Sequence, residues 1–240
     1  MAGDGKRILM HSGGLDSHIL WHWLGAADSG VTNVYVGHKA KNELQELTAL
    51  VRLKGMAEGF DYDVVGAETM IAHADSHIPH RNLRLMLKLA VAYPQVEEIY
   101  YGALRGEASA DKSEAFIAAA SRCLSESEGR RIDVIAPFAQ ITKTQVVRLG
   151  YELVPLAELD ATRSCYSWAE GVCGQCQACF RRDAAFASIH KTPMPTLPDQ
   201  ALTRGPLDNL LDTPIRRLPA LLAANRDYVA GRMRDLTPWN

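Results

Sequence analysis

Six consecutive residues near the N-terminus, Ser12-Gly-Gly-Leu-Asp-Ser17, are of types that bind phosphate. Gly13 and Gly14 let the backbone bend and approach an anion closely, so that loop N–H groups converge on phosphate oxygens. Ser12 and Ser17 add hydroxyl donors, and Asp16 is a candidate Mg²⁺ ligand because its charge would otherwise repel phosphate. A plain strand-to-helix turn also uses glycine and serine. The whole hexad, placed between an apolar run and a helical pattern, favours a nucleotide loop made by Ser12, Gly13, Gly14, Leu15, Asp16 and Ser17.

A second group of reactive side chains consists of four cysteines near the other end of the chain: Cys165, Cys173, Cys176 and Cys179. Four thiolates suit tetrahedral Zn²⁺, and closed sites of this kind are usually structural. The run Cys-x2-Cys-x2-Cys also occurs in iron–sulfur proteins, so the spacing leaves a cluster open as an alternative. The sequence therefore predicts a metal site, with zinc as the preferred occupant.

Length and composition limit the classes of protein that can carry these motifs. The chain has 240 residues, enough for one sizeable domain or a domain with a small appendage. Its 26 basic and 28 acidic side chains nearly cancel, which disfavours a nucleic-acid partner. No secretory signal and no apolar stretch of about 18 residues are seen, so we expect a cytoplasmic protein without a membrane partner.

Short apolar runs alternate with helical patterns in the first 150 residues or so. The runs predict strands at 6–10, 31–36, 62–65, 97–101 and 132–136, and the helical patterns lie at 19–24, 42–56, 83–93, 113–124 and 143–149. This alternation predicts an α/β fold with a doubly wound, mainly parallel five-stranded sheet that is Rossmann-like. We expect Leu44, Leu47, Val51 and Met56 to form the buried face of the second helix. The third helix is apolar on nearly all sides and should be buried.

Three segments follow from these patterns. Residues 1–160 form the predicted nucleotide domain, and residues 161–190 form a zinc-binding segment packed on it. Residues 191–240 form a proline-rich linker followed by a helical tail at 218–233.

The loop lacks the Gly-Lys-Ser/Thr of a Walker motif. It resembles the pyrophosphate loop of the N-type ATP pyrophosphatases (the PP-loop superfamily, with an adenine nucleotide alpha-hydrolase-like fold), which split ATP between its α- and β-phosphates. The cysteine segment from Ser164 to Phe186 resembles that of the 7-cyano-7-deazaguanine synthase (QueC) family. Looser similarities lie at Asn42–Leu44, Pro79–Asn82, Pro137-Phe138 and Thr142-Lys143. The resemblance covers roughly residues 6 to 188.

The resemblance implies an enzyme that uses ATP, Mg²⁺ and Zn²⁺. It implies a small-molecule substrate, 7-carboxy-7-deazaguanine, whose carboxylate is adenylated and then attacked by ammonia to give an amide and finally a nitrile. It also implies a homodimer. Under this reading Asp16 and Lys143 are catalytic, and the substrate residues are Arg81, Asn82, Asp111, Tyr166 and Arg182.

Plainer roles for four of these residues stay open. Lys143 could be a solvated lysine in a first helical turn, and Tyr166 a packed surface tyrosine. Asn82 could cap a helix, with Arg81 as a surface charge beside it.

Three stretches depart from the family pattern. Residues 102–116 lack the Asp-x-Ser-Gly-Tyr-Pro-Asp-Cys-Arg of the family, so that only Asp111 and Phe116 align. Gly37-His-Lys39 stands in place of Tyr-Gly-Gln, and Arg163 in place of a tryptophan. These stretches should border the acceptor pocket rather than the ATP loop.

The departures keep other functions open. One is a ligase that transfers the activated deazaguanine to another amine, such as one on a protein or a metabolite. A tRNA-modifying adenylase is a further alternative, which the near-neutral charge disfavours. A non-catalytic, zinc-stabilised nucleotide-binding module is the alternative of another class.

Overall fold

A computed structural model describes residues 6–25, 30–38, 40, 42–66, 80–107, 109–167 and 171–190. The linker and the helix expected within 191–240 lie outside these residues, as do Lys39 and Pro79 of the motifs above.

Five strands form one parallel sheet. They are β1 (Arg7–Met10), β2 (Thr32–Val36), β3 (Asp63–Val65), β4 (Glu98–Tyr100) and β5 (Asp133–Ile135), in the order β3-β2-β1-β4-β5. All four pairings are parallel, with Ile8 opposite Thr32 on one side of β1 and opposite Ile99 on the other. The chain winds outward from β1 to β3 and then returns to β4 on the other side of β1. The predicted doubly wound sheet is therefore confirmed, and the strand order switches beside β1.

The described part of the chain also contains seven α-helices and one 3₁₀ turn. They are α1 (Leu15–Trp23), α2 (Glu43–Met56), α3 (Arg81–Ala92), η2 (Ala110–Lys112), α4 (Glu114–Glu128), α5 (Lys143–Leu153), α6 (Leu156–Ala161) and α7 (Gln177–His190). Local sequence fixes two of the starts. Ser113 caps α4 by accepting the Phe116 N–H, and Thr142 forms a capping box with Gln145 at α5. The pattern analysis did not anticipate α6 or α7.

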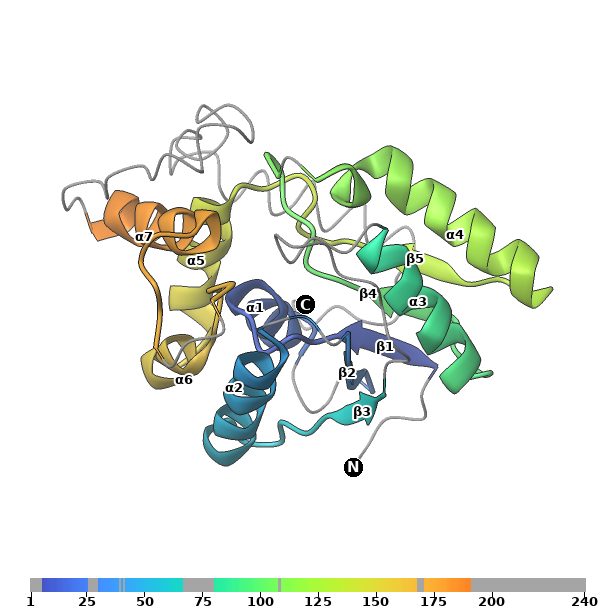
Figure 1. The fold of residues 1–240 in the computed structure, drawn as a ribbon, viewed down its shortest axis with the longest axis horizontal. Helices are drawn as coiled ribbons and strands as arrows, with labels where there is room; N and C mark the ends of the chain where they lie inside the picture. The colour runs from blue at the N-terminus through green and yellow to red at the C-terminus, as the bar shows by residue number, and fades with distance from the viewer. Residues whose placement is uncertain are drawn as a thin grey trace.

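The sheet separates two apolar layers, as a doubly wound fold requires. Leu9, Tyr35 and Tyr100 point into one cluster, which also contains residues of α1, α2 and α5. Ile8, Val34 and Ile99 point into the other, with residues of α3 and α4. Figure 1 shows α3 and α4 on one side of the sheet, and the group α5, α6 and α7 on the opposite side with α1 and α2.

Two predictions about helix faces are wrong in part, although Leu47 of α2 is half-buried against the core as expected. Leu44 and Val51 of α2 are 70% and 62% exposed, and Met56 is also exposed. The buried residues of α2 are Ala49, Leu50 and Leu53, because Ala49 and Leu50 pack against the glycine loop. Leucines recur every three residues in this helix, so the sequence offers more apolar positions than the core can take.

Helix α3 is buried on one face rather than all round. Its buried residues are Asn82, Leu85, Met86, Leu89 and Ala90, whereas Arg84 and Val91 are exposed. The polar residues within the apolar run mark the face that meets solvent. Among the described residues, none of the helices combines the length and the apolar character that crossing a bilayer requires.

Candidate functional site

The glycine loop leaves the carboxyl end of β1 at the point where the strand order switches. Gly13 has a φ of +69°, and a Cβ placed there would lie 2.8 Å from the backbone oxygen of Glu46, so only glycine fits. Gly14 is the N-cap of α1 and makes no side-chain capping hydrogen bond. His11 Nδ1 accepts the Gly13 N–H at 3.1 Å, and burial lowers the pKa of His11 well below its usual value. This ring is therefore neutral, which matches its role as acceptor.

The loop opens into a pocket that most of the predicted site residues line. They are Ser12, Gly14, Leu15, Asp16, Ser17, Arg81, Asn82, Lys143 and Tyr166. Gly13 does not line the pocket and packs instead against α2. Asp111 and Arg182 do not line the pocket.

Asp16 and Lys143 come together across 127 residues of sequence. Lys143 Nζ lies 2.5 Å from Asp16 Oδ1, and the two side chains are 7% and 23% exposed. The Thr142 capping box places Lys143 as the first residue of α5, the helix that follows β5 in the chain. Burial lowers the pKa of Lys143, although the charge of Asp16 opposes the shift. Lys143 is therefore not a solvated surface lysine.

Asn82 and Asp111 form one hydrogen-bonded unit at the start of α3. Asn82 Nδ2 donates to Asp111 Oδ2 at 2.8 Å, and the Tyr101 hydroxyl donates to the backbone oxygen of Asp111 at 3.2 Å. His80, not Asn82, occupies the N-cap of α3, with a φ of +56°. Asn82 is buried, so the capping role considered for it is wrong. Asp111 acts on the pocket through Asn82.

Three charged side chains that the sequence did not single out form a network at the pocket wall. Glu107 Oε2 lies 2.7 Å from Lys112 Nζ, and Glu107 Oε1 lies 3.3 Å from Arg181 Nη1. Burial lowers the pKa of Lys112, but Glu107, Tyr166 and Asp16 together outweigh it and the net shift is upward. Glu107 and Lys112 belong to the stretch that departs from the family pattern, and that departure was the signal that could have identified them.

Arg182 has a different surrounding from its neighbour Arg181. It donates to Thr162 Oγ1 at 2.8 Å and to the backbone oxygen of Leu159 at 2.9 Å. Its guanidinium also lies 5.3 Å from the centre of the Phe186 ring. Arg182 thus joins α7 to α6, whereas Arg181 reaches the pocket.

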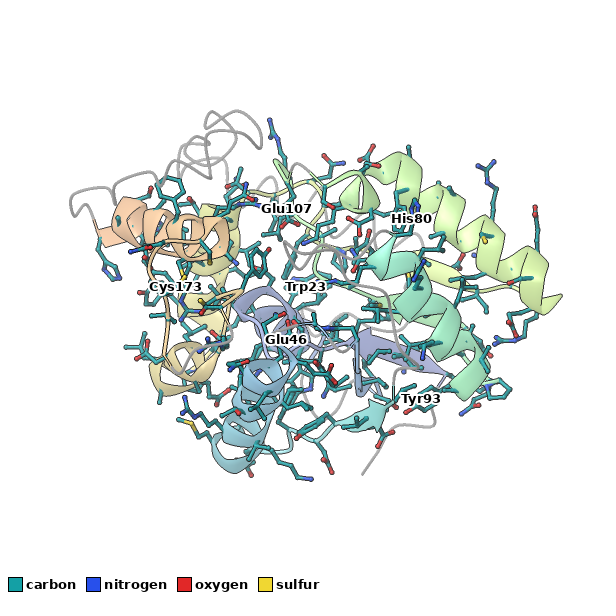
Figure 2. The ribbon with its side chains drawn as sticks, viewed as in Figure 1. Trp23, Glu46, His80, Tyr93, Glu107 and Cys173 are labelled. Carbon is teal, nitrogen blue, oxygen red and sulfur yellow. The ribbon has the colours of Figure 1, made fainter. Side chains whose placement is uncertain are left out.

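A second set of pocket residues surrounds Glu46; the sequence pointed to His38, in a stretch expected to border the acceptor pocket, but not to Tyr35 or Glu46. Glu46 Oε2 accepts the Tyr35 hydroxyl at 3.1 Å and lies 2.9 Å from His38 Nε2, while Asn42 Nδ2 donates to Oε1 at 2.8 Å. Tyr35, His38 and Glu46 all line the pocket. Glu46 on α2 and Glu107 come from different parts of the fold (Figure 2).

The pocket lining carries more positive than negative side chains. Five cations, Arg81, Lys112, Lys143, Arg163 and Arg181, stand against three carboxylates, Asp16, Glu46 and Glu107. The excess of two positive charges suits an anionic ligand, and walls that exclude water strengthen the attraction.

The four cysteines are gathered around one point. Their sulfurs lie 3.5 Å apart for Cys165 and Cys173, 4.0 Å for Cys173 and Cys179, and 3.5 Å for Cys176 and Cys179. A tetrahedral zinc ion with Zn–S bonds of about 2.3 Å would separate its sulfurs by about 3.8 Å. The group therefore fits a four-thiolate metal site, in agreement with the sequence. Cys173 lies near α5 and α7, far from His80 at the start of α3 (Figure 2).

The residues around this metal site reach the pocket. Tyr166 follows Cys165 directly, and Ala178 and Arg181 flank Cys179 on α7; all three line the pocket. A metal held by the cysteines would therefore fix one wall of the pocket without facing the loop.

Comparison with known proteins agrees with this arrangement. A family model described as queuosine biosynthesis protein QueC matches residues 63–190. A 7-cyano-7-deazaguanine synthase of Methanosphaerula palustris is 30% identical over 216 residues, covering 77% of this chain and 95% of that protein. A 7-cyano-7-deazaguanine synthase of Marinomonas sp. is 24% identical over 216 residues, covering 78% of this chain and 95% of that protein.

Among solved structures, a 4-thiouridine synthetase in complex with RNA and ATP is 18% identical, with a TM-score of 0.44. The match covers 92% of this chain and 53% of that chain. The family model and the relatives of similar length decide the assignment: this chain belongs to the family of the queuosine biosynthesis protein QueC.

Proposed function

We propose that this chain adenylates the carboxylate of a 7-carboxy-7-deazaguanine-type substrate with ATP and converts it, with ammonia, to an amide and then a nitrile. The observation that carries the proposal is the single pocket in which the glycine loop, the Asp16–Lys143 pair and the residues beside the cysteine cluster meet. Relatives named 7-cyano-7-deazaguanine synthase support the identity of the substrate.

ATP binds with its phosphates on the loop in this proposal. Ser12, Ser17 and the first N–H groups of α1 donate to phosphate oxygens, and the helix N-terminus favours their charge. Asp16 would hold a Mg²⁺ ion, which would supply positive charge beside the phosphates, and Lys143 neutralises charge on the departing pyrophosphate. The close Asp16–Lys143 contact holds both groups beside the loop.

Adenylation removes the main barrier to the reaction. A carboxylate oxygen attacks the α-phosphorus, pyrophosphate leaves, and the acyl-adenylate now carries a good leaving group. Ammonia attacks the carbonyl carbon, and AMP departs with the former carboxylate oxygen to leave an amide. A second ATP adenylates the amide oxygen, and loss of AMP and two protons gives the nitrile. Holding the partners in one pocket makes each attack effectively unimolecular.

The substrate lies against Arg81, Asn82 and Tyr166 in this scheme. Asp111 positions Asn82 by its hydrogen bond, and Arg182 positions α7 by its bonds to α6. The four cysteines would hold a Zn²⁺ ion, which would be structural and would keep Tyr166 and Arg181 at the same wall.

A second candidate uses the same activation with a different amine as acceptor. It is favoured by the Glu107–Lys112–Arg181 network, which places residues of the divergent stretch in the pocket wall. In this case an amine of a protein or metabolite replaces ammonia.

The test incubates the protein with Mg-ATP, 7-carboxy-7-deazaguanine and ammonium, and follows nucleotides and deazaguanine products by mass spectrometry. We expect AMP and pyrophosphate that depend on the substrate, together with amide and nitrile. Adenylation without amide or nitrile, and with deazaguanine mass added to another amine, favours the second candidate. Absence of substrate-dependent AMP contradicts both.

A further inference from the structure

Two histidines of α1 and one glutamate of α6 meet behind the nucleotide loop. His18 and His22 are four residues apart, so they project from the same side of their helix. His18 Nε2 lies 2.9 Å and His22 Nε2 lies 2.8 Å from the same atom, Glu158 Oε2. One ligand atom from each residue lies within 4.8 Å of the other two. Three metal-binding atoms therefore converge on one point that the proposed reaction does not use.

Hydrogen bonding alone leaves this cluster incomplete. His18 and Glu158 are both buried, and among the described residues Glu158 has ion pairs only with the two imidazoles. A buried carboxylate is costly unless a positive charge or a metal ion lies beside it. A divalent cation would supply the missing charge.

The donor types and the spacing suit a transition metal. Two imidazoles and one carboxylate form a ligand set that zinc takes, with an open position left for water. A tetrahedral ion with bonds of about 2.0 Å separates its ligand atoms by about 3.3 Å. The two N···O contacts must therefore open by about 0.4 Å, which a small rotation of the Glu158 side chain provides. The His22 side chain is 16% exposed, which leaves an entry for the ion and a place for water.

We propose that His18, His22 and Glu158 form a second metal site, separate from the four cysteines, which takes Zn²⁺ or a similar divalent transition metal. Such an ion clamps α6 to α1, and α1 begins directly after the glycine loop. Arg163, two residues beyond α6, donates its backbone N–H to Gly13 O at 2.9 Å. An ion at this site would therefore stabilise the glycine loop through α1 and Arg163. Metal binding there does not require the proposed reaction.

The test counts metal ions and identifies their ligands in untagged protein. Metal is stripped, Co²⁺ is added, excess is removed by dialysis, and cobalt content and visible absorption are measured. We expect two Co²⁺ ions per wild-type chain, one with the charge-transfer absorption that only thiolate ligands give. His22→Gln and Glu158→Gln should each bind one ion and keep that absorption, which also shows that they are folded. His190→Gln, which removes a histidine elsewhere, should still bind two.

A single Co²⁺ ion in the wild type, or two ions in both site variants, overturns the proposal. If the variants fail to fold, the wild type alone decides. Its unfolding temperature should rise on addition of the first equivalent of Co²⁺ and again on the second. A rise that ends at the first equivalent overturns the proposal as well.

Discussion

The contact between Lys143 and Asp16 gives a measurable coupling. The two side chains are mostly buried, at 7% and 23% exposure, and their charged atoms are 2.5 Å apart. Removing one partner of a fully buried pair costs about 3–5 kcal/mol. Asp16 keeps partial contact with water, so we expect a coupling free energy of about 2 kcal/mol between Lys143→Met and Asp16→Asn.

The assay is urea unfolding of the wild type, both single variants and the double variant, followed by tryptophan fluorescence. Trp21 and Trp23 lie buried in α1 and report on this region. The matched control is the Lys54–Asp61 pair, which is 2.7 Å apart but exposed. Its cycle of Lys54→Met and Asp61→Asn should give a much smaller coupling, because water screens the pair.

Lys143→Met should also weaken binding of a non-hydrolysable ATP analogue about 10- to 100-fold. A charged hydrogen bond to phosphate contributes about 1.5–3 kcal/mol, and each 1.4 kcal/mol changes affinity tenfold. A coupling free energy below about 0.5 kcal/mol between Lys143 and Asp16 would refute their ion pair. An affinity for the analogue within about twofold of wild type would refute the role of Lys143 at the phosphates.

Three further predictions test other parts of the structure. Gly13→Ala should destabilise the chain by about 2 kcal/mol or more in the same urea titration, because the φ of Gly13 is +69° and the new Cβ would meet the backbone oxygen of Glu46. The control is Gly55→Ala in α2, where a Cβ has no described atom within 4 Å. This variant should be as stable as the wild type or more stable. Cys173→Ser should lower bound zinc and raise KM for the deazaguanine substrate more than for ATP, because Tyr166 and Arg181 lose their support; equal changes in both constants would contradict this. Burial raises the pKa of Glu98 despite its bond to Tyr100, so the folded state holds the proton to higher pH and stability falls as pH rises through that pKa. Glu98→Gln should therefore be more stable than the wild type at pH 7. The two proteins should be equally stable when the pH is low enough to protonate Glu98 in both the folded and the unfolded chain. A difference in stability that does not change with pH would contradict the raised pKa of Glu98.

The sheet was predictable because each strand is a short apolar run that ends at a glycine, proline or polar residue. The position of the loop at the carboxyl end of β1 follows from a general rule of parallel sheets, whereas the strand order comes from the structure. Helices α6 and α7 were missed for physical reasons. Helix α6 has only six residues, and α7 begins within the cysteine segment, where ligand spacing hides the helical period.

The nucleotide loop was readable because its residues are contiguous. The pocket wall was not, since its contacts join distant segments: Glu107 and Arg181 are 74 residues apart, and Asp16 and Lys143 are 127 apart. Sequence could name Asp16 and Lys143 but could not pair them. It also could not separate Arg181 from Arg182, because adjacent helical residues point in different directions and only the packing of α7 decides which one faces the pocket.

Adenylation of a deazaguanine carboxylate in the pocket can be tested directly. The most direct measurement supplies 7-carboxy-7-deazaguanine labelled with ¹⁸O in its carboxylate, together with ATP and ammonium, and determines the mass of the AMP formed. Attack of the carboxylate on the α-phosphorus predicts that AMP from the first activation carries one ¹⁸O atom. Unlabelled AMP alone, or ADP with labelled inorganic phosphate, would contradict adenylation at this site.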